Sequence, residues 1–465
     1  MAVAWVKKLG TDYVKDRVFV RNFFRDFCKA LNLKERLSAD DFDFSEIQDY
    51  IERERIKKQN LSEEEKKRLA QARKAIREAN KEKYGYAIVD GVKTEIGNYV
   101  VEPSSIFMGR GKHPLRGRWK PGAKEEDVIL NLSPDAPIPE GNWKEIVWRP
   151  NEMWIAKWRD KLRGKMKYVW LADHCFIKQR TDIRKFNKAR ELEDQIDKVR
   201  EHIWSNLDSG DAFRRKLATV CYLIDVLKLR VGDEKDKDEA DTVGAITLRP
   251  EHIKIGADGL TTFDFIGKDS VKWHKEVKLP EIVIDNLQEF IHEVQSCRFK
   301  GIRSKNVTAF LSEVMPGLTA KVFRTYHASK VVKDFLSKVP LKRDDPKYVK
   351  KSTATIANLQ AAIVCNHKRK PPKNWRESLR KKQERLKKLR SKGTKKAREK
   401  AKELSLRIKV MRMVRDYNLR TSLKSYIDPR IYYKWGNEVD FDWKLYYPKA
   451  LQKRFSWVEN PAFAE

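Results

Sequence analysis

The 465-residue sequence lacks the features that mark disulfide-rich, zinc-binding and nucleotide-hydrolysing proteins. Its five cysteines are scattered and form no CxxC pair, so neither a disulfide framework nor a structural zinc site is supported. No GxxxxGK[ST] motif occurs, which excludes an ordinary ATP or GTP site. The acidic run DEKDKDEAD (233–241) is more typical of a solvated loop than of a magnesium site. We therefore expect no cofactor, neither ATP nor an obligatory metal.

Long apolar runs are also missing. No segment approaches 18 consecutive apolar residues, and the first residues, MAVAWVKKLG, lack the apolar core of a signal peptide. Together with the odd number of cysteines, these absences predict a soluble protein of the reducing cell interior that has no membrane partner.

Negative charge is scarce relative to positive charge. There are 101 Lys and Arg residues against 67 Asp and Glu, which gives a formal net charge of +34. Such an excess predicts a polyanionic partner, because binding releases condensed counterions. Ribosome-associated and membrane-surface proteins can be equally basic, so the charge alone is only moderate support for a nucleic-acid partner.

The length and the periodicity of the sequence predict a multidomain α+β protein. In residues 1–175, a capping-box pattern at Ser62 and Glu65 precedes a charged helix that breaks at Gly85, and β-like runs such as DVILNL and MKYVWL follow. We expect a mixed α/β domain there, a mainly helical domain over 176–370 and a small helical C-terminal domain over 416–465. The basic, glycine-rich stretch MGRGKHPLRGRWK (108–120) is expected to form an exposed loop.

Residues 371–415 form a separate basic segment with 19 Lys and Arg against four Glu. Two series of residues within it step by 4, 3, 4 and 3 positions: Trp375, Leu379, Lys382, Leu386 and Leu389, and then Ala397, Ala401, Leu404, Ile408 and Met411. Two short heptad segments joined by a tight turn predict an antiparallel coiled-coil linker. A disordered basic linker is the alternative.

Three polar residues continue the apolar stripes of expected helices. Arg230 lies three residues beyond Leu227, which ends a stripe that begins at Phe213, and Gly232 supplies a helix stop. In the same way Arg324 precedes Ala328 by four positions, and His367 follows Ile363 by four. A cation at the end of a buried stripe costs free energy unless it has an anionic partner. A structural ion pair could explain each one, but the three together favour a phosphate pocket.

Five segments resemble, in order, the active-site segments of the eukaryotic-type DNA topoisomerase IB family. They are LKLRVGDEK (227–235), FIGKDS (265–270), GLTAKVFRTYHAS (317–329), CNHKR (365–369) and SLKSYIDPRI (422–431). The resemblance extends to FMGRGKHP (107–114), GKMKYVWL (164–171) and EADTVGAITLRPEHI (239–253), so it covers most of the chain.

The resemblance implies that Tyr426 is the nucleophile and that Arg230, Lys268, Arg324 and His367 surround the scissile phosphate. An ordinary tyrosine has a pKa near 10, so only about 0.1% is phenolate at neutral pH, and neighbouring cations favour that form. The arginines and His367 would stabilise the nonbridging oxygens, and Lys268, at a hairpin tip, would protonate the departing 5′ oxygen. The implied product is a 3′-phosphotyrosyl enzyme, whose ester keeps the bond energy for religation without ATP.

The resemblance also implies contacts with duplex DNA. The residues expected to make them are Arg110, Lys112, Lys167, Tyr168, Lys235, Asp269, Thr319, Ala320, Lys321 and Ser425. Residues 1–175 would be the cap of a monomeric clamp around supercoiled DNA, and 176–370 a catalytic domain resembling that of tyrosine recombinases. The implied activity is relaxation of positive and negative supercoils through single-strand cleavage, strand rotation and religation.

The sequence departs from the family at three places. Ser425 and His327 stand where the family commonly has Asn, and Met108 stands where relatives often have Arg. The missing N-terminal extension and short linker favour an archaeal member, cytoplasmic and nucleoid-associated, whereas a eukaryotic host would make it nuclear. Two other functions remain open: a tyrosine recombinase, which would need sequence-specific sites and tetrameric synapsis, and a non-enzymatic architectural DNA-binding protein.

Overall fold

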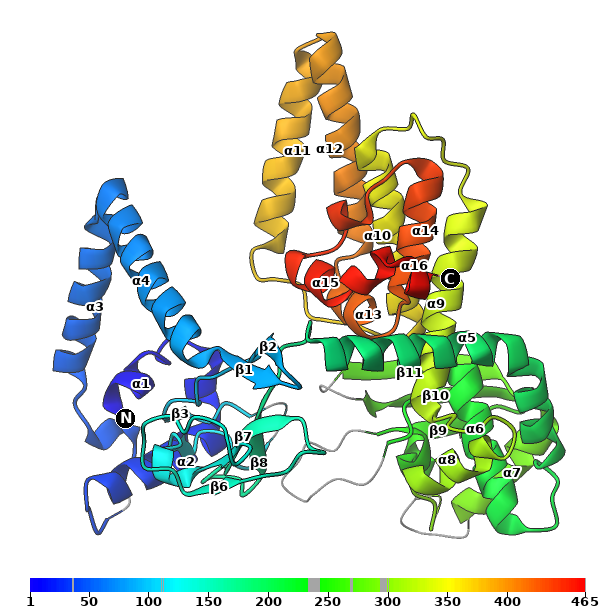
Figure 1. Ribbon diagram of the computed structural model, residues 1–465, viewed down its shortest axis with the longest axis horizontal. Coiled ribbons are helices and arrows are strands. Elements are labelled where there is room, and N and C mark those ends of the chain that lie inside the picture. Colours follow the sequence, from blue (N-terminus) through cyan, green and yellow to red (C-terminus); the bar gives the residue numbers. More distant parts are fainter. Residues whose placement is uncertain are drawn as a thin grey trace. The chain divides into compact units, whose positions relative to one another are not determined.

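The computed structural model describes residues 1–464 except for 36, 110, 112, 233–242, 268–270, 293–298 and 300. The described residues divide into two compact units, one comprising Met1–Cys175 and the other beginning at Phe176 (Figure 1). The molecule is a helix-rich α+β protein, in agreement with the coarse fold class predicted from the sequence. None of the helices in the described residues is long and apolar enough to cross a membrane.

The first unit begins with helices and continues with strands. Its helices are α1 (Ala2–Val6), α2 (Arg17–Ala30), α3 (Ser45–Asn60) and α4 (Glu63–Tyr84). Its strands are β1 (Tyr86–Val89), β2 (Val92–Glu95), β3 (Ser105–Ile106), β4 (Trp119–Lys120), β5 (Val128–Asn131), β6 (Glu145–Val147), β7 (Trp154–Arg159) and β8 (Met166–Trp170). They form the antiparallel pairs β1–β2 and β3–β4 and a four-stranded sheet in the order β6-β5-β7-β8, in which only β5 and β6 are parallel.

Local sequence signals explain the ends of the helices in this unit. Asp16 caps α2 by accepting hydrogen bonds from the backbone N–H groups of Val18 and Phe19. The predicted capping box of α4 is present, because Glu65 N donates to Ser62 Oγ and Ser62 N donates to the Glu65 carboxylate.

An aromatic cluster forms the core under α1 and α2. It contains Trp5, Phe19, Phe23, Phe24, Phe27 and Phe44, and Ile106 of β3 packs with it. A second core, with Val128, Leu130, Trp158 and Val169, lies against the four-stranded sheet. Burial of this apolar surface fixes α2 and both sheets.

The second unit is mainly helical. Its elements up to residue 364 are α5 (Phe176–Ser205), α6 (Ala212–Leu227), the antiparallel sheet of β9 (Ile253–Ile255), β10 (Leu260–Gly267) and β11 (Val271–Lys278), and then α7 (Glu281–His292), α8 (Ser304–Ser312), α9 (Ala320–Lys338) and α10 (Lys347–Val364). They are followed by α11 (Trp375–Ser391), α12 (Lys395–Met413), α13 (Leu419–Ser425), α14 (Pro429–Val439), α15 (Lys449–Arg454) and α16 (Pro461–Ala464).

Helices α11 and α12 run side by side as a hairpin (Figure 1). The Thr394 hydroxyl oxygen accepts a hydrogen bond from Ala397 N and so begins α12 immediately after the turn. Side chains at the predicted spacing on α12 are buried, among them Ala397, Ala401, Leu404 and Ile408. The hairpin is therefore ordered by an apolar seam between otherwise exposed, basic helices.

Two details of the predicted helix stripes are wrong. Helix α6 ends at Leu227 with Lys228 in the left-handed conformation (φ 59°), so it ends before Arg230 and does not reach Gly232. Phe213 and Ile363, which were expected on buried stripes, are 41% and 45% exposed. The spacing of apolar residues by three and four positions located the helices, but helix ends depend on backbone caps that this spacing does not encode.

Candidate active site

Tyr426 lies at the C-terminal end of α13, where neighbouring helices hold its backbone. Its N–H donates to Ser422 O (2.9 Å), and the buried Ser422 hydroxyl donates to Asn358 Oδ1 on α10 (2.8 Å). On the other side, Ser329 Oγ on α9 donates to Tyr426 O (3.2 Å) and accepts from Asp428 N (3.0 Å). Helices α9 and α10 thus fix the segment that carries the tyrosine.

Arg324 projects from α9 and is only 5% exposed. Its Nη1 donates to the carbonyl of Lys228, and its Nη2 donates to the carbonyl of Cys365 (2.9 Å). Both carbonyls belong to residues just past the ends of α6 and α10, where backbone acceptors are free. Arg324 therefore joins three helices, and its predicted position on the α9 stripe is confirmed by the burial of Ala328 and Val332.

Arg230 lies beyond α6 in an extended segment rather than on the helix. Its carbonyl accepts from Ala245 N (2.8 Å). Gly232 follows with φ 79°, and a Cβ there would lie 2.3 Å from Cα of Gly244. Only glycine permits this close approach of the two backbones, which sets the path of the chain next to Arg230.

His367 follows the C-terminal end of α10. Asn366 adopts the left-handed conformation (φ 52°), its N–H donates to Ile363 O (3.0 Å), and His367 N donates to Ala362 O (2.8 Å). These are the two bonds of a Schellman motif, for which Asn is a suitable residue. The turn places the ring of His367, which is 8% exposed, beside Tyr426.

These four side chains converge although they lie far apart in the sequence. The rings of His367 and Tyr426 are stacked, with centroids 5.3 Å apart. The guanidinium carbons of Arg324 and Arg230 lie 5.1 Å and 5.9 Å from the centroid of the Tyr426 ring. Nε2 of His367 is 3.5 Å from Arg324 Nη2. The structure therefore brings together four of the five residues predicted to be catalytic.

The electrostatics of this cluster are dominated by burial and by positive charge. Burial and repulsion from Arg324 and Arg230 lower the pKa of His367 to about 3, so its ring is neutral at physiological pH. Burial also lowers the pKa of Arg230, although attraction to the Tyr426 oxygen opposes this. Among the described residues, no carboxylate forms an ion pair with Arg230, Arg324 or His367.

Two buried polar atoms of the cluster, Arg324 Nε and His367 Nδ1, have no hydrogen-bond partner within the part of the chain that the structure describes. Because Arg324 can only donate, Nε2 of the neutral His367 ring accepts from it and the ring proton lies on Nδ1. Buried donors without partners are uncommon in folded proteins, and here they belong to residues beside the Tyr426 ring. An anion with several acceptor oxygens would satisfy them. In the part of the chain that the structure describes, no group of His, Cys, Asp and Glu side chains could hold a metal ion.

The other residues of the second unit predicted to contact DNA lie near Arg324 and Tyr426 in the sequence. Thr319 is the N-cap position of α9, Ala320 is buried at its first turn and Lys321 is exposed one residue later. Ser425 is half-buried and directly precedes Tyr426.

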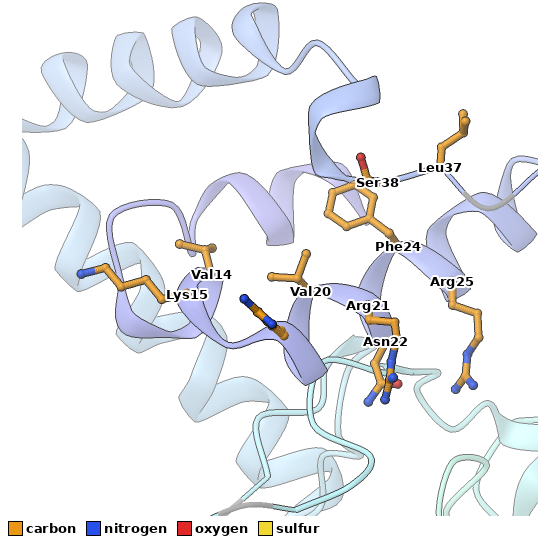
Figure 2. Close-up of a pocket in the computed structure, with 10 residues that line it drawn as sticks. Val14, Lys15, Val20, Arg21, Asn22, Phe24, Arg25, Leu37 and Ser38 are labelled. Carbon is orange, nitrogen blue, oxygen red and sulfur yellow. The ribbon is translucent and has the colours of Figure 1, made fainter.

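In the first unit, α2 supports the loop that was predicted to contact DNA. The Asn22 carboxamide donates to the carbonyls of Pro114 and Arg116, both at 2.8 Å. Asp26 accepts from Arg118 Nε (2.6 Å). Figure 2 shows the side chains of Arg21, Asn22 and Arg25 leaving the same part of α2. The loop is thus held against the helix, while its Arg110 and Lys112 lie outside the described residues.

The exposed face of α2 carries four cations at intervals of four residues: Arg17, Arg21, Arg25 and Lys29. Arg17, Arg21 and Arg25 line a cavity of about 590 Å³ together with Lys15 (Figure 2). Of the four cations, only Arg25 has a described carboxylate within 4 Å, that of Asp26 at 3.9 Å. Like charges at this spacing destabilise a helix, so a polyanion is the natural partner of this face.

The remaining predicted contacts of the first unit lie on β8. Tyr168 is 40% exposed, and its ring centroid is 5.0 Å from that of Trp170, which is 42% exposed. Lys167 is half-buried, with Nζ 3.7 Å from Glu102. An exposed aromatic pair beside a lysine is a surface that nucleic acid can use.

The whole chain matches known families. Residues 1–171 match the family described as "Eukaryotic DNA topoisomerase I, DNA binding fragment", residues 175–402 match "Eukaryotic DNA topoisomerase I, catalytic core", and residues 384–464 match "C-terminal topoisomerase domain". DNA topoisomerase I, mitochondrial, of Rattus norvegicus is 31% identical over 508 residues, which cover 99% of this chain and 85% of the rat protein.

The chain belongs to the eukaryotic DNA topoisomerase I family. DNA topoisomerase 1 of Drosophila melanogaster is 33% identical over 494 residues, or 99% of this chain and 50% of the fly protein. DNA topoisomerase 1 of Candidozyma auris is 37% identical over 393 residues, or 82% and 52%. The chain thus spans about half the length of these two relatives.

Three predicted residues, Lys235, Lys268 and Asp269, lie outside the described residues. The described strands β10 and β11 pair up to Gly267 and Val271, on either side of residues 268–270. Their predicted roles therefore stay predictions.

Sequence reasoning missed the groups that hold the cluster in place. The carbonyls of Lys228 and Cys365 bind Arg324, and Ser329 binds the backbone on both sides of Ile427. Backbone carbonyls carry no signal in a sequence. The left-handed Lys228 gives none either, because lysine is not typical of that conformation.

Proposed function

We propose that this protein is an ATP-independent type IB DNA topoisomerase, which cleaves one strand of duplex DNA, lets the duplex rotate and reseals the strand. The observation that carries the proposal is the convergence of Arg230, Arg324 and His367 on Tyr426, with no carboxylate among the described residues to neutralise them. Family membership and the names of the relatives support it.

The chemistry follows from this arrangement. The Tyr426 hydroxyl gives its proton to solvent, its oxygen attacks a backbone phosphorus and forms a bond to it, and the bond from phosphorus to the 5′ oxygen breaks. A 3′-phosphotyrosyl ester results, and attack by the 5′ hydroxyl reverses the step without ATP. Arg230 and Arg324 donate to the nonbridging oxygens, where charge-assisted, forked hydrogen bonds are strongest.

His367 and Lys268 supply the other two contributions. The neutral His367 ring has one N–H, and Nδ1 has no partner among the described residues, so it can donate to a phosphate oxygen without losing a described bond. Lys268 is proposed as the general acid that protonates the 5′ oxygen as it leaves.

The two compact units would act together on supercoiled duplex DNA as a monomeric clamp. The first unit offers the α2 face, the 108–120 loop and β8, and the second offers the cluster and the basic hairpin of α11 and α12. Rotation of the duplex held in the clamp would relax supercoils of both signs. A protein with this activity would be associated with the chromosome.

The first experiment tests the nucleophile. Tyr426→Phe removes only the phenolic oxygen, so it should abolish relaxation and the covalent adduct on a denaturing gel, whereas duplex binding stays within about 3-fold of the parent. The parent should remain active in EDTA and without nucleotide. A covalent adduct with Tyr426→Phe, or a strict metal requirement in the parent, would overturn the proposal.

The second experiment tests the division of labour between Lys268 and the arginines. Lys268→Ala should slow cleavage by about 10²–10⁴-fold, because an alkoxide is a poor leaving group. When sulfur replaces the 5′-bridging oxygen, the leaving group is a thiolate, which needs no proton from Lys268. Lys268→Ala should therefore cleave this DNA nearly as fast as the parent does.

The matched controls are Arg230→Ala and Arg324→Ala, which act on the nonbridging oxygens and should not be rescued by sulfur. Rescue of the arginine variants to the same extent would refute this division. If sulfur rescues none of the three, Lys268 positions DNA and is not the acid.

A further inference from the structure

A buried carboxylate links three helices directly behind the candidate active site. Asp225, near the end of α6, is 5% exposed. Its Oδ1 lies 2.6 Å from Nε2 of His327 on α9, and its Oδ2 accepts from Nε of Arg200 on α5 at 2.8 Å. Three helices therefore meet at one side chain, and none of its partners touches Tyr426 in the described contacts.

The link lies close to Arg324 and to the Lys228 carbonyl that Arg324 binds. His327 follows Arg324 by three residues, which is about one turn of α9. Asp225 precedes Lys228 by three residues, and the Lys228 carbonyl accepts from Arg324 Nη1. A shift of α9 against α6 would change this hydrogen bond and the position of Arg324 over Tyr426.

The protonation states make the link strong. Burial raises the pKa of Asp225, but hydrogen bonds from His327 and Arg200 outweigh it and lower the pKa to about 2. Burial lowers the pKa of His327, the bond to Asp225 opposes this, and repulsion from Lys228 adds to it. A neutral imidazole thus donates Nε2–H to an ionised carboxylate, and such hydrogen bonds are roughly twice as strong as neutral ones.

We propose that Asp225 and His327 are positioning residues for Arg324, an inference that rests on the proposed function. The pair ties α9 to α6 and thereby sets the distance between the Arg324 guanidinium, the Lys228 carbonyl and Tyr426. His327 therefore works behind the phosphate site and does not contact DNA. Its place is one where the family commonly has Asn, a side chain that can also donate one N–H to a carboxylate.

The test measures single-turnover cleavage of a suicide duplex at saturating protein, together with the Kd for the duplex and the thermal midpoint. His327→Leu removes the donor, and small displacements of catalytic groups can cost about 10²-fold in rate. We expect its cleavage rate to fall about 10–100-fold while Kd changes less than 3-fold. His327→Asn should recover to within about 3-fold of the parent.

The matched control is Lys333→Met, which removes a different contact of α9, the ion pair between Lys333 and Glu193 on α5 at 3.1 Å. It should leave the cleavage rate unchanged. A double-mutant cycle then shows whether His327 acts through Arg324. In an Arg324→Ala background, His327→Leu should slow cleavage no further.

Several outcomes would overturn the inference: parental cleavage by His327→Leu, equal loss with His327→Asn, or additive losses in the cycle. If His327→Leu does not fold, Asp225→Asn can replace it, because it keeps the shape of the side chain and removes its charge. We expect the same loss of cleavage rate from Asp225→Asn, and no further loss in the Arg324→Ala background. Failure of the proposed function has a different signature, because the parent itself would then form no covalent adduct.

Discussion

Partly buried arginines of the first unit and the arginines around Tyr426 in the second unit have different partners. In the first unit, Arg118 Nε lies 2.6 Å from Asp26, and Arg116 Nη1 lies 2.8 Å from Asp16. In the second unit, Arg324 is more deeply buried than either, yet its described partners are backbone carbonyls and a neutral histidine ring. Elsewhere in the second unit, Arg430 and Arg454 are paired with Asp428 and Asp182, so the lack of a carboxylate partner is a property of the cluster around Tyr426 and not of the whole unit.

The difference shows which buried cations to suspect of function. Desolvation of an isolated charge costs several kcal/mol in a protein, and in the first unit nearby carboxylates offset that cost. Around Tyr426 the cost is only partly offset in the free protein. A bound phosphate would supply the missing anion, so part of the binding free energy of DNA would come from relieving this repulsion.

Lack of a carboxylate is not sufficient by itself. Lys350 is 2% exposed and donates to the backbone carbonyls of Arg343 (2.6 Å) and Asp440 (3.3 Å), and it forms no ion pair with a described carboxylate. Asp440 is the C-cap of α14, so this lysine binds the free acceptor of a helix end. It stands alone and faces no nucleophile. The convergence of several such cations is what distinguishes the site.

The comparison is tested most directly by removing one arginine from each unit. Arg324→Ala should slow single-turnover cleavage by about 10²–10³-fold, the usual effect of losing one preorganised donor to a developing oxyanion. Its free energy of unfolding should change little, because relief of repulsion compensates for the lost carbonyl contacts.

Arg118→Ala is the matched control. It leaves Asp26 without this partner, so it should lower the free energy of unfolding by about 1–3 kcal/mol, with cleavage by the folded fraction unchanged. If the two variants exchange these signatures, the distinction between paired and unpaired cations carries no functional meaning.

The sequence predicted the elements better than their junctions. The capping box at Ser62 and the stripe through Arg324 were correct because side-chain pattern determines them. Arg230 and His367 reach the cluster by another route than predicted, through a left-handed Lys228 and a left-handed Asn366 beyond the helix ends. Resemblance to the family named residues that the structure brings together, whereas helix periodicity gave the wrong geometry.

A second test compares the two pairs of exposed helices. Helices α11 and α12 carry 17 Lys and Arg against four Glu over Trp375–Met413, whereas α3 and α4 carry 12 against nine Asp and Glu over Ser45–Tyr84. Changing Lys387, Lys388, Lys392, Lys395 and Lys396 to Gln should weaken duplex binding and reduce the slope of log Kd against log salt by up to about 4. Cleavage at low salt should persist.

The matched variant changes five exposed cations of the other pair to Gln: Lys58, Lys67, Arg68, Arg73 and Arg77. We expect a smaller change in slope, because the neighbouring carboxylates already neutralise much of that surface. Equal slopes for both variants, or an unchanged slope for the first, would show that the hairpin of α11 and α12 does not bind DNA.

The smallest expected effect concerns the acid stability of the free protein. The pKa of His367 is lowered from the usual 6.5 to about 3, so between these values the unfolded chain binds a proton that the folded protein does not. The contribution of this ring to stability is therefore complete above pH 6.5 and is lost as the pH falls towards 3, by up to about 1.4 kcal/mol per pH unit. His367→Gln has no titrating ring, so its free energy of unfolding should fall less steeply between pH 6 and pH 4 when both proteins are unfolded with urea.

Bound duplex should reduce the difference, because a phosphate beside the ring favours its charged form. Parallel curves for parent and variant without DNA would mean that burial and the arginines do not hold the ring neutral, and the argument that an anion is missing from the site would lose its electrostatic basis.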